Sequence, residues 1–114
     1  MLASKYSLKG SKNFERVEKE GTMFQSDSFG IVYVKREDND VSQLGFIVSN
    51  KISGEATLRN RVKRALKEAV RFNTGYLKDG YDVVFLAKTQ ILRKPTDVIM
   101  KEVEVALRGA GLYK

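Results

Sequence analysis

The sequence contains no cysteine and no histidine among its 114 residues. The absence of cysteine excludes disulfides, thiolate metal sites and thiol nucleophiles. The absence of histidine removes the only side chain whose unperturbed pKa lies near neutrality, and with it serine–histidine catalysis and most zinc chemistry. Carboxylates and lysines are the catalytic groups that remain, so the composition disfavours a protein that performs its own acid–base catalysis.

Long apolar runs are also missing, since none approaches the roughly 20 residues needed to span a bilayer. The first 14 residues, MLASKYSLKGSKNF, lack the continuous apolar stretch of a secretory signal. The one proline is Pro95, so no proline-rich linker divides the chain, and there is no internal repeat. We therefore expect a single domain over residues 1–114, located in the cytoplasm and not bound to a membrane.

Positive charge is abundant, with 21 Lys and Arg against 14 Asp and Glu, a net charge of +7 and a pI of about 9.7. Hydrophobic residues make up 42% of the chain, as in a folded globular protein. Such a balance predicts an anionic partner.

Secondary-structure signals alternate along the first half of the chain. Ser11 is a predicted cap of a first helix that ends near Gly21, with Phe14 and Val17 on one face. Residues 29–34 (FGIVYV) and 44–49 (LGFIVS) are rich in β-branched and aromatic residues and predict strands. The polar segment between them has the composition of a hairpin loop.

The second half continues the alternation. Thr57 is a predicted cap of a helix over residues 58–72, and Tyr81–Ala87 is apolar on both faces, as expected of a strand in the sheet interior. A last helix begins between Pro95 and Asp97 and ends at Gly109. Its predicted buried stripe is Ile99, Val103, Ala106 and Leu107. The pattern predicts an α/β or α+β fold with one sheet.

The predicted helix over residues 58–72 carries most of the positive charge. Residues 59–71 (RNRVKRALKEAVR) contain six basic side chains and one acid, Glu68, a net +5 out of the +7 of the chain. A step of roughly 100° per residue separates a cationic face from an apolar one. The cationic face holds Arg59, Asn60, Lys63, Arg64, Lys67 and Arg71, with Arg61 at its edge. The apolar face holds Leu58, Val62, Ala65, Leu66 and Ala69.

Like charges spaced four residues apart on this face repel one another, and phosphates would relieve that repulsion. Arginine suits phosphate well because its planar guanidinium donates two parallel hydrogen bonds. A merely solvated basic face and a membrane-surface helix are the alternatives. The second is disfavoured because the apolar face is built partly of alanine and valine and has no tryptophan.

Residues 44–71 (LGFIVSNKISGEATLRNRVKRALKEAVR) resemble the signature region of the bacterial ribonuclease P protein component family. The RNRVKR core is followed by KEAVR and preceded by the strand end VSNK. SKNFERVEKEG is similar to the first helix of the family, and GYDVVFLAK to its strand after the basic helix. The resemblance implies a two-layer α/β (α+β) sandwich with one mixed sheet, the order αβββαβα and a left-handed βαβ crossover. It thus adds one strand to those predicted above.

The family's activity is removal of the 5′ leader from precursor tRNA, with the chemistry carried by a large RNA and its Mg²⁺ ions. The resemblance therefore implies that this chain binds ribonuclease P RNA and precursor tRNA, holds no cofactor itself and does not bind DNA. By position, seven residues would contact the catalytic RNA: Arg59, Asn60, Arg61, Lys63, Arg64, Lys67 and Arg71. Phe14, Tyr33 and Lys51 would line a leader cleft between the sheet and the first helix. Plain core packing is the alternative role for Phe14 and Tyr33.

Three positions depart from the family pattern. Glu18 stands where a second aromatic or apolar residue is frequent, Asn50 where a lysine is common, and GEAT replaces glycine–x–alanine–valine. A carboxylate at position 18 would repel a leader phosphate if it faced the cleft.

Two other functional classes share the size and charge of this chain. One is a ribosomal-type or general RNA-binding protein, which would not stimulate precursor-tRNA cleavage. The other is a DNA-binding domain that uses residues 58–72 as a recognition helix, but no helix precedes it at the short turn that a helix-turn-helix requires. An acidic cluster of Glu37, Asp38 and Asp40 fits a solvated loop better than a cation site.

Overall fold

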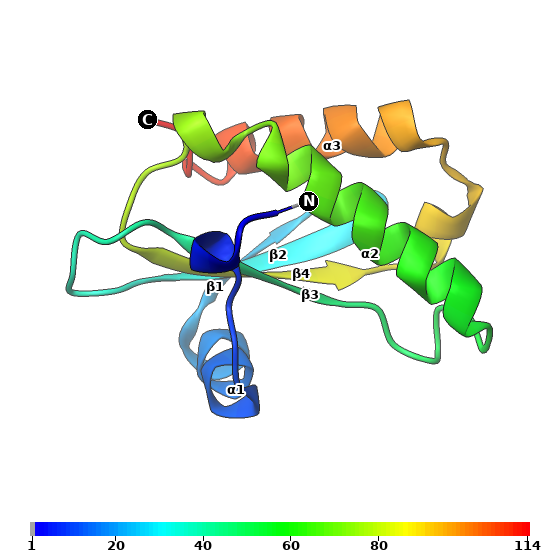
Figure 1. Cartoon of the computed structure of the whole chain (residues 1–114), viewed down its shortest axis with the longest axis horizontal. Coiled ribbons are helices and arrows are strands. Elements are labelled where there is room, and N and C mark those ends of the chain that lie inside the picture. The colour runs from blue at the N-terminus through cyan, green and yellow to red at the C-terminus, as the bar shows by residue number, and fades with distance from the viewer. Residues whose placement is uncertain (1) are drawn as a thin grey trace.

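The computed structural model describes residues 2–114, which form a four-stranded sheet with helices on both faces (Figure 1). The main helices are α1 (Ser11–Glu20), α2 (Ala56–Arg71) and α3 (Thr96–Gly109). The strands are β1 (Thr22–Gln25), β2 (Phe29–Lys35), β3 (Gln43–Ile47) and β4 (Tyr81–Ala87). Short 3₁₀ turns are η1 (Ser4–Tyr6), η2 (Thr74–Tyr76) and η3 (Thr89–Arg93). The order of main elements is αβββαβα, as predicted.

The strand order in the sheet is β1-β2-β4-β3. β1 pairs antiparallel with β2 and β2 with β4, whereas β3 and β4 are parallel and connected through α2. The expectation that residues 35–43 form a hairpin loop is therefore wrong, because β4 lies between β2 and β3. The prediction that β4 is an interior strand is confirmed. The hand of the β3–α2–β4 connection stays an expectation from the resemblance.

Two apolar cores lie on opposite faces of the sheet. The larger core joins alternate strand residues such as Ile31, Phe46 and Phe85 to the buried sides of α2 and α3. The smaller core joins Val32 and Val84 to α1 and to the segment before it. Figure 1 shows α2 and α3 on one side of the sheet and α1 on the other. α1 thus adds a layer to the implied two-layer sandwich.

Element boundaries follow the predictions at α3 and β4, and the buried residues of α3 are the four predicted. The predicted caps are wrong: Gly10 with φ of 89° precedes α1, and Glu55 precedes α2, neither with a side-chain cap hydrogen bond. Ser11 and Thr57 lie inside the helices instead. β1, which pattern analysis did not find, is a four-residue edge strand whose residues are mostly exposed.

The segment that precedes α1 covers the open edge of β3. Ser7 forms a parallel bridge with Leu44, and the Leu8 amide donates to the Leu44 carbonyl at 2.9 Å. This contact occupies the edge of β3 at Leu44 and leaves less of it open to another strand. The cover also places Ser7 and Leu8 between α1 and α2, where they line the grooves described below.

Candidate nucleic-acid interface

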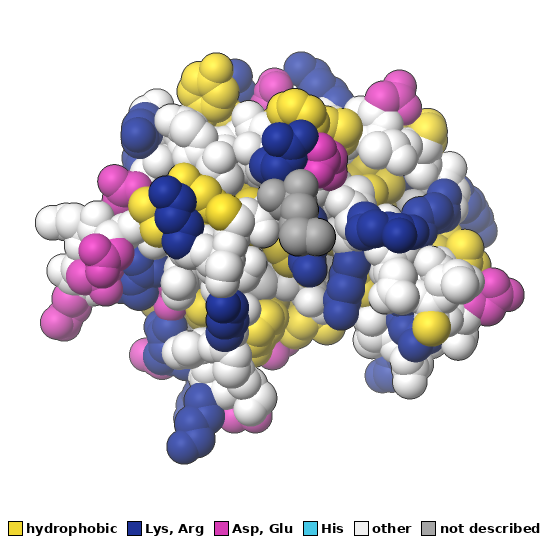
Figure 2. Space-filling view, in the orientation of Figure 1, with side chains coloured by type: hydrophobic (Ala, Val, Ile, Leu, Met, Phe, Trp, Pro, Cys, Tyr) yellow, Lys and Arg dark blue, Asp and Glu magenta, His cyan; other side chains and the backbone are white. Residues whose placement is uncertain are grey.

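α2 separates its charged and apolar sides as the sequence predicts. Val62, Ala65, Leu66, Ala69 and Val70 are buried against the sheet and α3. We call the opposite side the basic face; it consists of Arg59, Asn60, Arg61, Lys63, Arg64, Lys67 and Arg71. Figure 2 shows Lys and Arg side chains spread over α2 on the viewed face. Arg59 and Lys63 are half-buried and the other five residues are exposed, so the face is open to a large partner.

The charges of the basic face are largely left unneutralised. Within residues 2–114, Arg71 is its one cation in an ion pair, with Glu68 in the preceding turn. That hydrogen bond raises the pKa of Arg71 and lowers the pKa of Glu68. Arg59 donates to the Ser53 carbonyl at 2.9 Å and Arg61 to the Leu92 carbonyl at 3.4 Å. These two contacts orient guanidinium groups without cancelling their charge.

A groove of about 590 Å³ runs along the basic face, between α2, the N-terminal segment and the start of α3. Its lining includes the cations Arg61, Arg64 and Lys67 against one carboxylate, Glu68, together with Ser7 and Thr96. Cations along a concave surface concentrate anions there, because the low-dielectric walls focus the field. This geometry suits a polyanion lying along α2.

A second, smaller hollow, which we call the Phe14 groove, lies on the other side of Lys67. It has a volume of about 140 Å³ and crosses β3 between α1 and α2. Its lining consists of Ser7, Leu8, Phe14, Leu44, Gly45, Phe46, Lys63 and Lys67. An aromatic residue of α1 and two lysines of α2 thus line one groove. Lys63 and Lys67 belong to both the basic face and the Phe14 groove.

Tyr33 does not share a cleft with Phe14, and this part of the prediction is wrong. Tyr33 packs against the larger core on the α2 and α3 side, next to its pairing partner Val83. Phe14 packs against the smaller core on the α1 side. Successive strand residues point to opposite faces, so Val32 and Val34, which adjoin the smaller core, are the β2 residues on the side of Phe14.

The remaining predicted cleft residue, Lys51, is exposed in the turn after β3 and is not part of the Phe14 groove lining among the described residues. Asn50 beside it is also exposed. Glu18 lies one turn after Phe14 on α1 and is exposed. A carboxylate at that position puts negative charge on the helix that carries Phe14.

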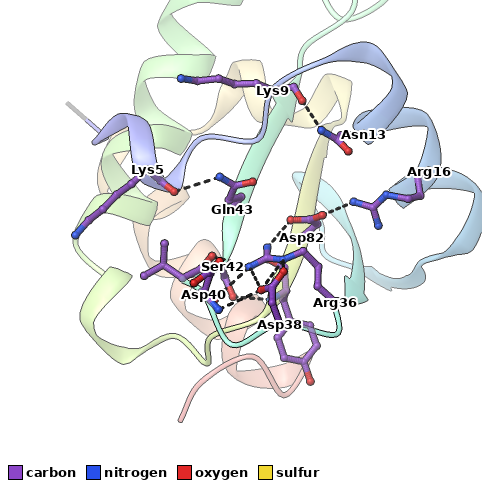
Figure 3. A network of polar contacts seen from close by, with 12 residues as sticks. Lys5, Lys9, Asn13, Arg16, Arg36, Asp38, Asp40, Ser42, Gln43 and Asp82 are labelled. Atoms are coloured by element: carbon purple, nitrogen blue, oxygen red, sulfur yellow. Dashed lines mark hydrogen bonds and ion pairs between the residues drawn. The ribbon is translucent and has the colours of Figure 1, made fainter.

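A buried carboxylate in β4 fixes α1 and the β2–β3 connection, and it was not found from the sequence. Asp82 is 2% exposed and forms ion pairs with Arg16 of α1 and with Arg36, the latter at 2.6 Å (Figure 3). Arg36 also holds Asp38 and the carbonyls of Tyr81 and Val41. A buried carboxylate within an apolar strand requires such partners. The single acid in the apolar run of β4 was therefore the sequence signal that could have predicted this network.

The acidic cluster of the β2–β3 connection takes part in the same network. Asp38 accepts hydrogen bonds from the Arg36 guanidinium, which lowers the pKa of Asp38. Within residues 2–114 no group of three or more acidic side chains has the arrangement of a metal site. No helix of that part of the chain is long and apolar enough to cross a membrane.

Comparison with known proteins places these features in one family. The sequence model of the family described as Ribonuclease P matches residues 2–111. The ribonuclease P protein component of Clostridium kluyveri is 38% identical over 111 residues, which cover 96% of this chain and 97% of the relative. That of Caldanaerobacter subterraneus is 35% identical and covers 94% of this chain and 90% of the relative.

Solved structures agree with the sequence comparison. The Staphylococcus aureus RNase P protein is 27% identical with a TM-score of 0.87, over 96% of this chain and 98% of that one. The Thermotoga maritima RNase P protein is 28% identical with a TM-score of 0.79, over 90% and 96%. With a matching sequence model over nearly its whole length and relatives of the same size and fold, this chain belongs to the bacterial ribonuclease P protein component family.

Proposed function

We propose that this chain binds ribonuclease P RNA along the basic face of α2 and the 5′ leader of precursor tRNA in the Phe14 groove. In doing so it promotes endonucleolytic removal of the leader. The observation that carries the proposal is the shared position of Lys63 and Lys67, which line the Phe14 groove and belong to the basic face. A substrate strand in the groove would therefore lie directly beside an RNA bound along α2.

The groove has the chemistry of a single-strand site. The Phe14 ring offers a stacking surface that accepts any base, and stacking of this kind is tolerant of sequence. Lys63 and Lys67 supply charge for the phosphates on the α2 side. Together these groups would hold a leader by its backbone and its bases, without reading its sequence.

The hydrolysis itself is assigned to the partner RNA and its Mg²⁺ ions. The chain has no histidine or cysteine, and the residues that line the Phe14 groove include no carboxylate. The groove therefore offers no carboxylate or imidazole base for attack by water, and its two lysines are assigned to the phosphates. What the protein supplies is positioning of the leader and neutralisation of phosphate charge.

Filter binding to a bacterial ribonuclease P RNA over a range of salt concentrations tests the first half of the proposal. Each phosphate contact contributes roughly −0.7 to −0.9 to the slope of log K against log salt. Arg64→Ala should weaken binding and make the slope shallower by the contribution of about one phosphate contact. Lys78→Ala, an exposed cation outside the basic face, is the matched control and should change neither. A wild-type slope near zero would overturn the proposal.

The second half is tested by comparing precursor tRNA with the same tRNA lacking its leader, each bound by the complex of protein and RNA. Phe14→Ala should lower the affinity for the leader-bearing form only. Equal losses of affinity for the two forms of tRNA, with the protein still folded, would show that the leader does not bind in the Phe14 groove.

A further inference from the structure

A third groove lies at the far end of α2, away from Phe14. It has a volume of about 420 Å³ and opens between the last turn of α2, η2, α3 and the C-terminal residues. Phe72, Tyr76 and Tyr113 contribute aromatic rings to its lining. Figure 1 shows this end of α2 beside the C-terminus, and Figure 2 shows hydrophobic side chains exposed there.

Two of the three aromatic rings of this groove are unusually exposed. Phe72 is 58% and Tyr76 is 63% exposed, whereas Phe29 and Phe85 in the core are fully buried. Neither ring is needed to complete the core, because α2 already buries Val62, Leu66 and Val70. Exposed large apolar side chains gathered at one place mark an interaction site more often than isolated ones do.

The groove is also built rigidly. Tyr76 stacks on Tyr113 with ring centroids 6.0 Å apart and planes inclined by 20°. The Tyr113 hydroxyl donates to the side-chain carbonyl of Asn73, and the Asn73 amide donates to the Ala69 carbonyl at 2.6 Å. Burial, and then the Glu104 carboxylate, raise the pKa of Tyr113. The platform is therefore held in place before any partner arrives.

Arginines accompany the rings. The Arg71 guanidinium lies 4.6 Å from the centre of the Phe72 ring, and that of Arg108 lies 4.7 Å from the centre of the Tyr113 ring. Arg71 is also the last cation of the basic face, so the groove continues that face. On the α3 wall, Asp97 and Glu104 make the surface less favourable for phosphate, although Lys101 and Arg108 pair with Glu104.

We propose that this groove receives one or two unpaired bases of an RNA whose neighbouring phosphates contact the basic face. The bases would stack on Phe72 and Tyr76, and the phosphate between them would lie on the α2 side beside Arg71. The inference rests on the proposed function, since it takes the RNA on α2 as its starting point. It adds a base-stacking site at the C-terminal end of α2, beyond the Lys63 and Lys67 positions that line the Phe14 groove.

The test uses the full chain, a bacterial ribonuclease P RNA and the double variant Phe72→Leu with Tyr76→Leu. Loss of one stacked base should weaken binding roughly 5- to 100-fold, and loss of two stacked bases at least about 30-fold. The salt slope should not change, because no cation is removed. A control double variant, Phe72→Tyr with Tyr76→Phe, keeps an aromatic ring at both positions and should bind the RNA as tightly as the wild type. Thermal melts should show only a small loss of stability, from the Tyr76–Tyr113 stack, since both substituted side chains are exposed.

The outcomes separate this site from the proposed function. If the wild-type chain binds the RNA and the leucine variant binds equally well, the stacking site is wrong while the proposed function stands. If the wild type does not bind the RNA, the proposed function fails first. Wild-type self-association in sedimentation that the leucine variant abolishes, with unchanged RNA affinity, would show that the rings contact a second copy and would overturn the proposal.

Discussion

The ring of Phe14 lies so close to Gly45 of β3 that a Cβ atom at position 45 would stand 2.4 Å from two of its ring carbons. The hydrogen side chain of Gly45 thus leaves room for the edge of the Phe14 ring against the strand, and both residues line the Phe14 groove. Neither residue alone indicates this pairing in the sequence, because they come from different elements.

Gly45→Ala should push the Phe14 ring out of the groove. We expect a loss of about 1–3 kcal/mol in the free energy of unfolding, typical of an overpacked site. The variant should also lose the preference for leader-bearing tRNA, measured by the comparison of the two tRNA forms. Gly54→Ala is the matched control, because nothing lies within 4 Å of a Cβ atom there. Unchanged leader preference in Gly45→Ala would contradict the assigned geometry.

Charged and apolar sides of α2 should respond oppositely to substitution. Arg64→Ala removes an exposed cation and should cost about 1–3 kcal/mol of RNA binding with little change in stability. Leu66→Asp places a carboxylate in the core, where Leu66 is fully buried, and should unfold the protein. Thermal melts and RNA affinities for both variants make the comparison. If Arg64→Ala destabilised the fold while its folded fraction kept full RNA affinity, the assignment of Arg64 to an RNA-binding face would be wrong.

The Asp82 network should contribute strongly to stability. Asp82→Asn leaves Arg16 and Arg36 without their shared carboxylate, and breaking a buried pair costs about 3–5 kcal/mol. We expect the lower end of that range because 35% of the Arg16 side chain is exposed. Urea denaturation measures the effect, with the exposed Asp79→Asn as control. Equal stability of the two variants would show that the network contributes nothing.

Acid should destabilise the protein partly through Glu102, which joins α3 to the β1–β2 turn. Burial alone would raise the pKa of Glu102, but hydrogen bonds from Ser28 and Lys94 outweigh burial and lower the pKa below its ordinary value of 4.5. A carboxyl with a lower pKa in the folded state stabilises the fold above its unfolded pKa. That contribution is lost as the pH falls below about 4.5.

Glu102→Gln should therefore be less stable than wild type near neutral pH and should lose less stability in acid. Between pH 6 and 8, where no carboxylate and no histidine of this chain titrates, the stability difference between the two proteins should stay constant. Denaturation at several pH values measures these slopes. If Glu102→Gln lost stability in acid as steeply as the wild type, the Glu102 carboxyl would not account for the acid sensitivity.

Sequence patterns predicted the regular, strongly patterned elements well. The apolar run of β4 and the charge separation of α2 arise from local sequence, and the structure follows them. β1 was not predicted because TMFQ is short and lies at the edge of the sheet. Its residues are mostly exposed, so they show no apolar pattern. The position of β4 between β2 and β3 depends on long-range pairing, which local composition does not encode.

The candidate site was predictable in part for the same reason. The basic face lies on one helix, so its period of 3.6 residues places every member. The predicted leader cleft combines residues of several elements, and Tyr33 was assigned to the wrong face of β2. Tyr33 is two residues from Ile31 and so shares its face, a signal that was available in FGIVYV. Gly45 and the Lys63–Lys67 wall needed the tertiary structure.

The central claim is that this chain enables a ribonuclease P RNA to remove the leader of precursor tRNA. The most direct measurement is single-turnover cleavage at low Mg²⁺, with the protein alone, the RNA alone and the two together. We predict rapid cleavage only for the mixture, reduced when Arg64→Ala replaces the wild type and unaffected by Lys78→Ala. Cleavage by nuclease-treated protein alone, or a mixture no faster than the RNA alone, would contradict the account.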